Sequence, residues 1–115
     1  MNQNNSNCIS TFGANPSMGA NLTSGALNIK DYVGFCFFIK WTGLTVSGTW
    51  KLQVSNDSGT PTNWTDLSGA TYVATGPDSA LFIVTSAFYA HVRAVYTRAA
   101  GTGTVTEAYF TGKGY

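Results

Sequence analysis

Short runs of aromatic and β-branched residues, separated by clusters of Gly, Asn, Asp and Pro, fill the chain from Gly34 onward. Within these runs apolar and polar residues alternate, which is typical of antiparallel β structure, and no stretch keeps a helical period. The pattern predicts strands at 34–41, 49–55, 64–67, 70–74, 80–85, 90–97 and 104–111, with a further short edge strand within 22–29.

The run at 34–41 is apolar on both of its predicted faces, which indicates a central strand. One face carries Phe35, Phe37, Ile39 and Trp41, and the other carries Cys36, Phe38 and Lys40. A single open sheet of this composition would leave one apolar face in water. We therefore predict an all-β fold, an antiparallel β-sandwich or jelly roll of about 7–8 strands with an extended N-terminal arm.

Residues 1–19 are rich in Asn, Ser and Gly and contain few apolar residues. Such a segment buries too little apolar surface to offset the entropy of ordering itself. The pattern predicts a flexible or extended N-terminal arm over 1–19, followed by one β-sandwich domain over 20–115.

The segment VSNDSGTPTNW, residues 54–64, interrupts the strands with turn-forming residues. Asn56 and Asp57 can bond to nearby backbone, Gly59 permits a left-handed conformation, and Pro61 ends strand pairing. We interpret the segment as a corner after which Trp64 returns to the core as a lid. The alternative is an exposed Trp64 that acts as a ligand platform.

Charged residues make up only 10% of the chain, and the formal net charge is +1. This composition provides no electrostatic field for nucleic acid or an anionic membrane, and no apolar stretch is long enough to span a bilayer. The first ten residues, MNQNNSNCIS, have neither a basic region nor an apolar region of a secretory signal, so we expect synthesis in a cytoplasm.

Residues suited to acid–base, nucleophilic or metal chemistry are scarce. His91 is the only histidine, and the carboxylates are Asp31, Asp57, Asp66, Asp78 and Glu107. Most of these carboxylates fall in predicted turns or at strand edges, where Asp is favoured for structural reasons. Cys8 and Cys36 have no zinc or redox spacing, although a disulfide between them is possible. We therefore expect no enzymatic activity, no catalytic residue, no metal and no cofactor.

The aromatic residues could instead serve binding, because rings stack on the apolar faces of sugars. Core packing explains most of them, since Trp41 and Trp50 alternate in step with neighbouring aliphatic residues. The alternative ligand-binding set is Asn63, Trp64, Asp66 and Tyr72, which would form a carbohydrate-binding site.

Several short motifs occur in a fixed order along the chain. They are WKLQVSND at 50–57, NWTDL at 63–67, HVRAVYT at 91–97, GTGT at 101–104 and GKG at 112–114. In this order, together with NLTS at 21–24 and VGF at 33–35, they make the chain resemble a group of small virion proteins of tailed bacteriophages. The likeness covers roughly residues 20–114.

The resemblance implies a structural role in the phage particle and carries no enzymatic site. The motifs alone do not separate a capsid decoration (cement) protein from a tail or fibre component. The small size, the absence of catalytic residues and the polar N-terminal arm favour a decoration protein, located on the capsid surface and made in the cytoplasm of the host bacterium. Such a protein would form a homotrimer and bind the major capsid protein, with the arm crossing a capsomer boundary. The expected partner-binding residues are Asn4, Asn5, Ile9, Phe12 and Asn15. The alternative is a tail or fibre component that acts as a receptor- or carbohydrate-binding module.

Overall fold

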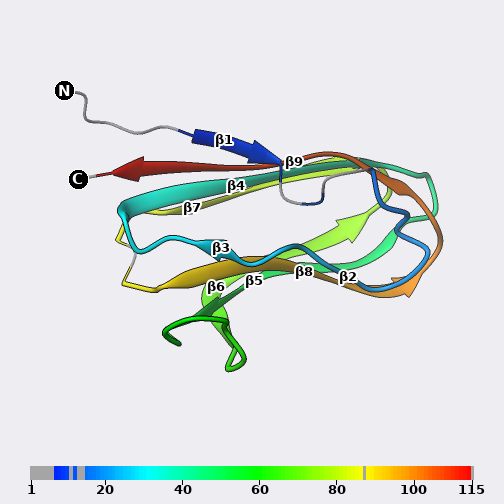
Figure 1. Ribbon diagram of the computed structural model, residues 1–115. Helices are drawn as coiled ribbons and strands as arrows, with labels where there is room; N and C mark the ends of the chain where they lie inside the picture. Colours follow the sequence, from blue (N-terminus) through cyan, green and yellow to red (C-terminus); the bar gives the residue numbers. More distant parts are fainter. Residues whose placement is uncertain (1–6, 11, 13–14, 87, 115) are drawn as a thin grey trace.

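Two antiparallel sheets lie face to face in the computed structural model, which describes residues 7–10, 12, 15–86 and 88–114 (Figure 1). The four-stranded sheet has the order β1-β9-β4-β7, and the five-stranded sheet has the order β2-β8-β5-β6, with β3 also paired to β8. The strands are β1 (Asn7–Ser10), β2 (Leu22–Thr23), β3 (Leu27–Asn28), β4 (Tyr32–Thr42), β5 (Ser47–Ser55), β6 (Thr65–Thr75), β7 (Asp78–Val84), β8 (His91–Ala100) and β9 (Thr104–Gly114). The predicted all-β sandwich is confirmed.

The core lies between the sheets and is built by the alternation that the sequence shows. Phe37, Ile39 and Trp41 of β4 are buried, whereas Cys36 and Phe38 between them are only partly buried. Because β4 lies between β9 and β7, its predicted central position is also confirmed.

A group of aromatic rings joins the two sheets across this core. Trp41 of β4 and Trp50 of β5 have ring centroids 6.0 Å apart, and Trp50 lies 4.9 Å from Tyr96 of β8. The Trp41 indole Nε1 donates a 2.7 Å hydrogen bond to the carbonyl oxygen of Gly76, so its polar atom is satisfied inside the apolar interior.

Part of the predicted N-terminal arm belongs to the sandwich. Asn7–Ser10 form β1, an edge strand paired with β9. Farther along, Met18 is fully buried, its amide donates to Gly103, and the Val105 amide donates to Pro16. The described parts of residues 7–19 are therefore held by backbone pairing and by Met18, whereas residues 1–6 lie outside the described residues.

Strand β6 differs from the prediction of two separate strands at 64–67 and 70–74. It is one strand with an irregular middle, because Gln53 of β5 pairs with Asp66 whereas Lys51 pairs with Thr71. Two steps along β5 thus correspond to five along β6, and the extra residues form a bulge that includes Gly69 at a φ of +82°.

Cys36 is a free thiol. In the register of the sheet, Cys8 and Cys36 both pair with Thr111 of β9, on its opposite sides. Their Cα atoms are therefore two strand spacings apart, about 9.6 Å, which exceeds the roughly 7 Å that a disulfide can span. This geometry is incompatible with the disulfide that the sequence left open.

Candidate functional site

The outward surface of the four-stranded sheet is apolar. Phe38 of β4 lies between Leu81 of β7 and Tyr109 of β9, and Cys36 lies beside Ile83. Since their chain neighbours point into the core, these side chains point outward. Leu81 is 56% exposed and Ile83 is 66% exposed. We call Cys36, Phe38, Leu81, Ile83 and Tyr109 together the apolar outer face. Contiguous exposed apolar surface of this kind is typical of protein interaction sites.

One end of this face is hollow and the other end is charged. A depression of about 480 Å³ is lined in part by Gly34, Cys36, Ile83 and Thr111. At the other end Lys40 and Glu107 pair across β4 and β9, with their charged atoms 3.9 Å apart. The apolar outer face thus has a charged rim at one end, as protein interfaces commonly do.

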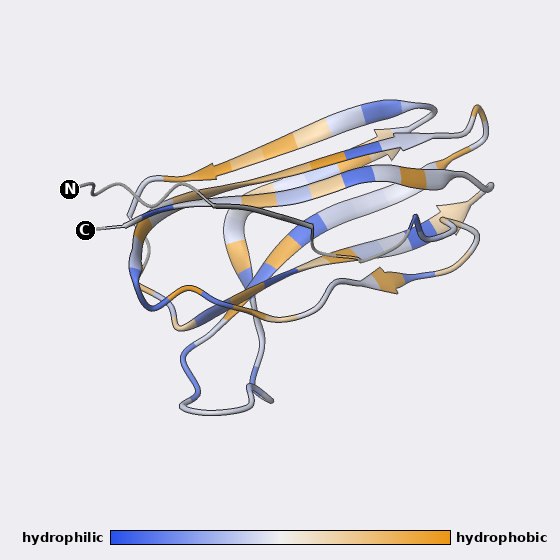
Figure 2. Cartoon of the chain, turned by 45° about the horizontal axis from the view of Figure 1, so that its top comes forward, coloured by the Kyte–Doolittle hydropathy of each residue, from blue (hydrophilic) through white to orange (hydrophobic). Residues whose placement is uncertain are grey.

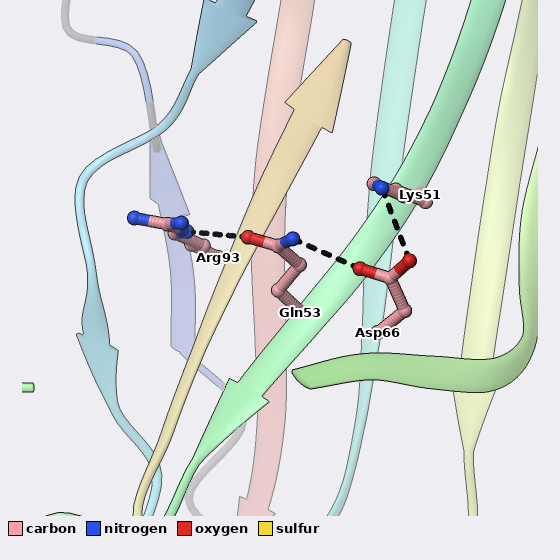
Figure 3. Close-up of polar contacts among 4 residues, drawn as sticks. All are labelled: Lys51, Gln53, Asp66 and Arg93. Atoms are coloured by element: carbon pink, nitrogen blue, oxygen red, sulfur yellow. Dashed lines mark hydrogen bonds and ion pairs between the residues drawn. The ribbon is translucent and has the colours of Figure 1, made fainter. Parts of the chain in front are cut away.

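The outward surface of the five-stranded sheet carries a network of four polar side chains (Figure 3). Arg93 Nε donates to Gln53 Oε1 at 2.9 Å, and Gln53 Nε2 donates to Asp66 Oδ1 at 2.9 Å. Lys51 Nζ donates to Asp66 Oδ2 at 3.0 Å. We call these four residues the polar ladder. The hydrogen bond from Gln53, and then that from Lys51, lowers the pKa of the Asp66 carboxyl, so Asp66 is a fixed anion in this network.

Trp64 packs against the end of the polar ladder. The guanidinium carbon of Arg93 lies 4.2 Å from the centroid of its ring, which is a cation–π contact. Trp64 is half-buried in this position. One face of the ring is therefore occupied by Arg93.

The loop between β5 and β6 projects from the body of the sandwich and is mostly hydrophilic (Figures 1 and 2). Asp57 holds it together, because its Oδ2 accepts hydrogen bonds from the amides of Thr62 at 2.7 Å and Asn63 at 2.8 Å. The Asn63 side-chain amide also donates to Asp57 Oδ1 at 3.2 Å. The backbone bonds from Thr62 and Asn63 are the main reason that the pKa of Asp57 is far below its ordinary value.

This arrangement predicts a diagnostic titration. Because the folded-state pKa of Asp57 is depressed, its stabilising effect on the loop is complete above the ordinary carboxyl pKa of about 4 and is lost as pH falls toward the lower folded value. In two-dimensional NMR, the amide signals of Thr62 and Asn63 should titrate well below pH 4. The same titration should vanish in Asp57→Asn. A titration midpoint near the ordinary carboxyl pKa would contradict the hydrogen bonds from Thr62 and Asn63 to Asp57.

The four predicted ligand residues are not brought together. Asn63 and Asp66 line one depression of about 640 Å³ beside the loop. Trp64 lies against Arg93 instead. Tyr72 is aligned with Trp50, packs edge-on against Trp41 at 5.8 Å, and donates a hydrogen bond to Asp78. Of the four, only Asn63 and Asp66 therefore line a common depression.

The predicted partner-binding residues fall partly outside the described residues. Asn4 and Asn5 lie outside them, and so does the side chain of Ile9 in β1. Phe12 packs edge-on against Trp50, with centroids 6.1 Å apart, and Asn15 is exposed. Phe12 thus contributes to the core, and the role of the other residues stays a prediction.

Groups that could carry catalysis or bind metal are dispersed in the described part of the chain. His91 is buried, and its Nδ1 has no hydrogen-bond partner among the described residues. Across 7–10, 12, 15–86 and 88–114, no three His, Cys, Asp or Glu residues are grouped to hold a metal ion. The same residues include no helix with the length and apolarity needed to cross a membrane.

The sequence did not single out Leu81, Ile83 or Tyr109 for binding, nor Gln53 as the centre of the polar ladder. The apolar run at 80–85 was visible. The sequence does not show that Leu81 and Ile83 lie beside Phe38 and Cys36, because that depends on the register between β7 and β4.

Comparisons with known proteins give the fold. The SPBc2 prophage-derived protein YomS matches with a TM-score of 0.60 at 13% sequence identity, over 96% of each chain. Chitosan-binding module 1, from a chitosanase/glucanase of Paenibacillus sp. IK-5, matches with a TM-score of 0.48 at 21% identity, over 93% of each chain. No family model matches this chain, and no curated protein matches it in sequence.

Proposed function

We propose that this protein is a structural component of a tailed-phage particle, and that it decorates the capsid by binding the major capsid protein. The ordered motifs over roughly residues 20–114 support the phage origin. The fold shared with the prophage-derived protein YomS agrees with it, but at 13% identity it transfers the fold and not the role. The observation that carries a protein-binding role is the apolar outer face.

The composition of that face suits a protein partner. Phe38, Tyr109, Leu81 and Ile83 are aromatic and aliphatic, and interface centres are enriched in aromatic residues and depleted of charge. Removing such residues from water contributes about 25 cal/mol per Å² of apolar surface. The pair of Lys40 and Glu107 lies at the edge of this face, where charge adds orientation.

The polar groups elsewhere support binding over chemistry. Asp57, Asp66 and Asp78 each accept hydrogen bonds from neighbouring residues that hold a loop, a sheet face or a sheet edge in place. A general acid or base must exchange a proton with its substrate, so its pKa has to lie near the working pH. The hydrogen bonds that these three carboxylates accept lower their pKa values instead. These groups therefore act in the fold.

Replacement of Phe38 by alanine tests the proposal. Truncation of a central interface aromatic typically weakens binding by about 2 kcal/mol or more, so we expect at least a roughly 30-fold loss of affinity. Purified protein should be sedimented with shells assembled without it, and the bound fraction measured. Val73→Ala is the matched control, because Val73 is 66% exposed on the five-stranded sheet. Unchanged binding by folded Phe38→Ala and Tyr109→Ala variants would refute this role for the face.

The N-terminal segment gives a second test of the capsid role. Removing all of residues 1–19 would delete β1 and Met18, so any loss of binding would be confounded by loss of structure. Removing residues 1–6 leaves both in place. If these residues contact the capsid, as proposed for Asn4 and Asn5, the shorter deletion should keep the circular dichroism spectrum and weaken shell binding.

A receptor- or carbohydrate-binding role is the second candidate. It is favoured by the depression shared by Asn63 and Asp66, but Arg93 covers one face of the Trp64 ring. A glycan array probed with the purified protein separates the two roles. Specific glycan binding that is abolished by Trp64→Ala would favour the second candidate over the first.

A further inference from the structure

The edges of the two sheets are protected to different extents. Exposed edges present unpaired backbone groups to other strands, and natural proteins protect them with short strands, bulges, charge or Pro. Three of the four edges are protected. One is formed by β1, which has four residues, and one by β2 and β3, which have two residues each. The third is formed by β6, which carries the bulge at Gly69. The fourth edge strand, β7, has no bulge and no Pro, and its one charged residue is Asp78 at its start.

Strand β7 is long and regular. Its seven residues pair with β4 in uninterrupted register, from Phe35 opposite Val84 to Trp41 opposite Asp78. Its sequence, DSALFIV, has one charge, at its first residue, and neither Lys, Arg nor Pro. Leu81 and Ile83 are exposed on its outward side. By the criteria that predict edge-to-edge association, β7 is an unprotected edge.

There is also space beside this edge. Near Asp78, β6 and β7 are joined by the hydrogen bond from Tyr72 to Asp78. Toward the other end of β7 a cleft of about 400 Å³ opens, lined by residues 67–70 of the bulge and by residues 81–86. The bulge thus leaves room along the half of β7 that carries Ile83.

We propose that β7 pairs antiparallel with β7 of a second copy of this chain, across a twofold axis near Phe82. In that register Leu81 lies opposite Ile83 of the other copy, and Ala80 lies opposite Val84, so apolar residues meet on both faces. The Asp78 carboxylates lie at opposite ends of the paired strands, which avoids like-charge repulsion. Two four-stranded sheets would then form one continuous sheet.

A second copy is the occupant that the sequence of β7 favours. An open row of backbone donors and acceptors selects an extended strand, and β7 itself offers an uncharged strand with matching alternation. Shifting the register by two residues, so that Leu81 faces itself, would place Val84 against Asp78 and Ile83 against Ser79. Antiparallel pairing of identical strands is twofold, so this proposal replaces the trimer expected from the sequence with a dimer.

Sedimentation of the full chain without any capsid protein tests the proposal. We expect a dimer at micromolar concentration, and at least about tenfold weaker self-association for Ile83→Lys, because Lys is a natural protector of edges. The matched control is Val73→Lys, which puts the same charge at an equally exposed Val of the other sheet. A wild-type monomer at about 100 µM, a trimer, or an Ile83→Lys variant as dimeric as the wild type would overturn the proposal.

Hydrogen exchange of the wild-type protein keeps the proposal testable if the variant fails to fold. Amides of β7 that face the free edge should exchange more slowly as protein concentration rises, whereas those of β6 should not change. Concentration-independent exchange in β7 would refute the pairing. Protection of β7 that appears only when capsid shells are added would assign the edge to a capsid strand instead. The sedimentation test uses no capsid shells, so its result concerns only the pairing of two β7 strands. The capsid role is tested separately by binding to shells.

Discussion

Replacing Trp41 by alanine is expected to lower the free energy of unfolding by about 3–5 kcal/mol, the range for large aromatic residues removed from a core. Trp41 is 1% exposed and spans the interior, where it contacts Trp50 and Tyr72 of the opposite sheet. Domains of this size are stable by only about 5–15 kcal/mol. The variant should therefore lose a large part of its stability, as measured by urea denaturation followed by circular dichroism.

Two further variants separate the contributions at this position. Trp41→Phe retains a ring but leaves the carbonyl of Gly76 without its indole donor, and we expect a smaller loss of about 1–3 kcal/mol. Leu44→Ala changes a residue that is 89% exposed in the nearby turn, and should be nearly neutral. Equal losses for Trp41→Ala and Leu44→Ala would mean that the tryptophan cluster does not hold the sheets together.

Alternation in the sequence was sufficient to predict which residues of β4 share a face. Phe37, Ile39 and Trp41 are spaced by two and were predicted to lie on one face, and the structure buries all three. Turn chemistry was equally local. Gly59 was predicted to permit a left-handed conformation, and its φ is +87°.

Strand β1 was not predicted, because the residues of this segment show no pattern that is typical of a strand. Asn7–Ser10 has no amphipathic alternation, and the strand is defined by backbone pairing with Phe110 and its neighbours at the edge of β9. The burial of Met18 was missed for the same kind of reason. Met18 was one isolated apolar residue in a polar segment, and its backbone is held by a hydrogen bond to the distant residue Gly103.

The polar ladder and the apolar outer face needed register that the sequence does not provide. Gln53 and Arg93 are separated by 40 residues, and Gln53 meets Asp66 only because the bulge in β6 shifts the pairing. A one-residue slip in a strand would turn every side chain to the other face. Tyr72 illustrates the effect, since it was grouped with Asp66 in the sequence but lies on the inward side, aligned with Trp50.

The second large effect is expected at Gly101, in the turn between β8 and β9. Its φ is +75°, and a β-carbon added there would lie 1.8 Å from the carbonyl oxygen of Thr45. Thr45 lies in the turn between β4 and β5. The two turns are held in contact by the hydrogen bond from the Thr102 amide to Thr45 Oγ1 at 3.1 Å. The added carbon therefore meets backbone that is fixed in place, and cannot be accommodated by rotating a side chain.

Gly101→Ala should combine two penalties. A left-handed conformation costs a residue with a β-carbon about 1–2 kcal/mol, and forcing an extra methyl group into a filled space costs a further 1–3 kcal/mol or so. Gly59→Ala is the matched control, because its φ is +87° but nothing lies within 4 Å of the added carbon. In urea denaturation the difference between the two variants should report the close approach of the turns alone. Equal destabilisation would show that the turns can separate without loss, and that their contact does not stabilise this end of the sandwich.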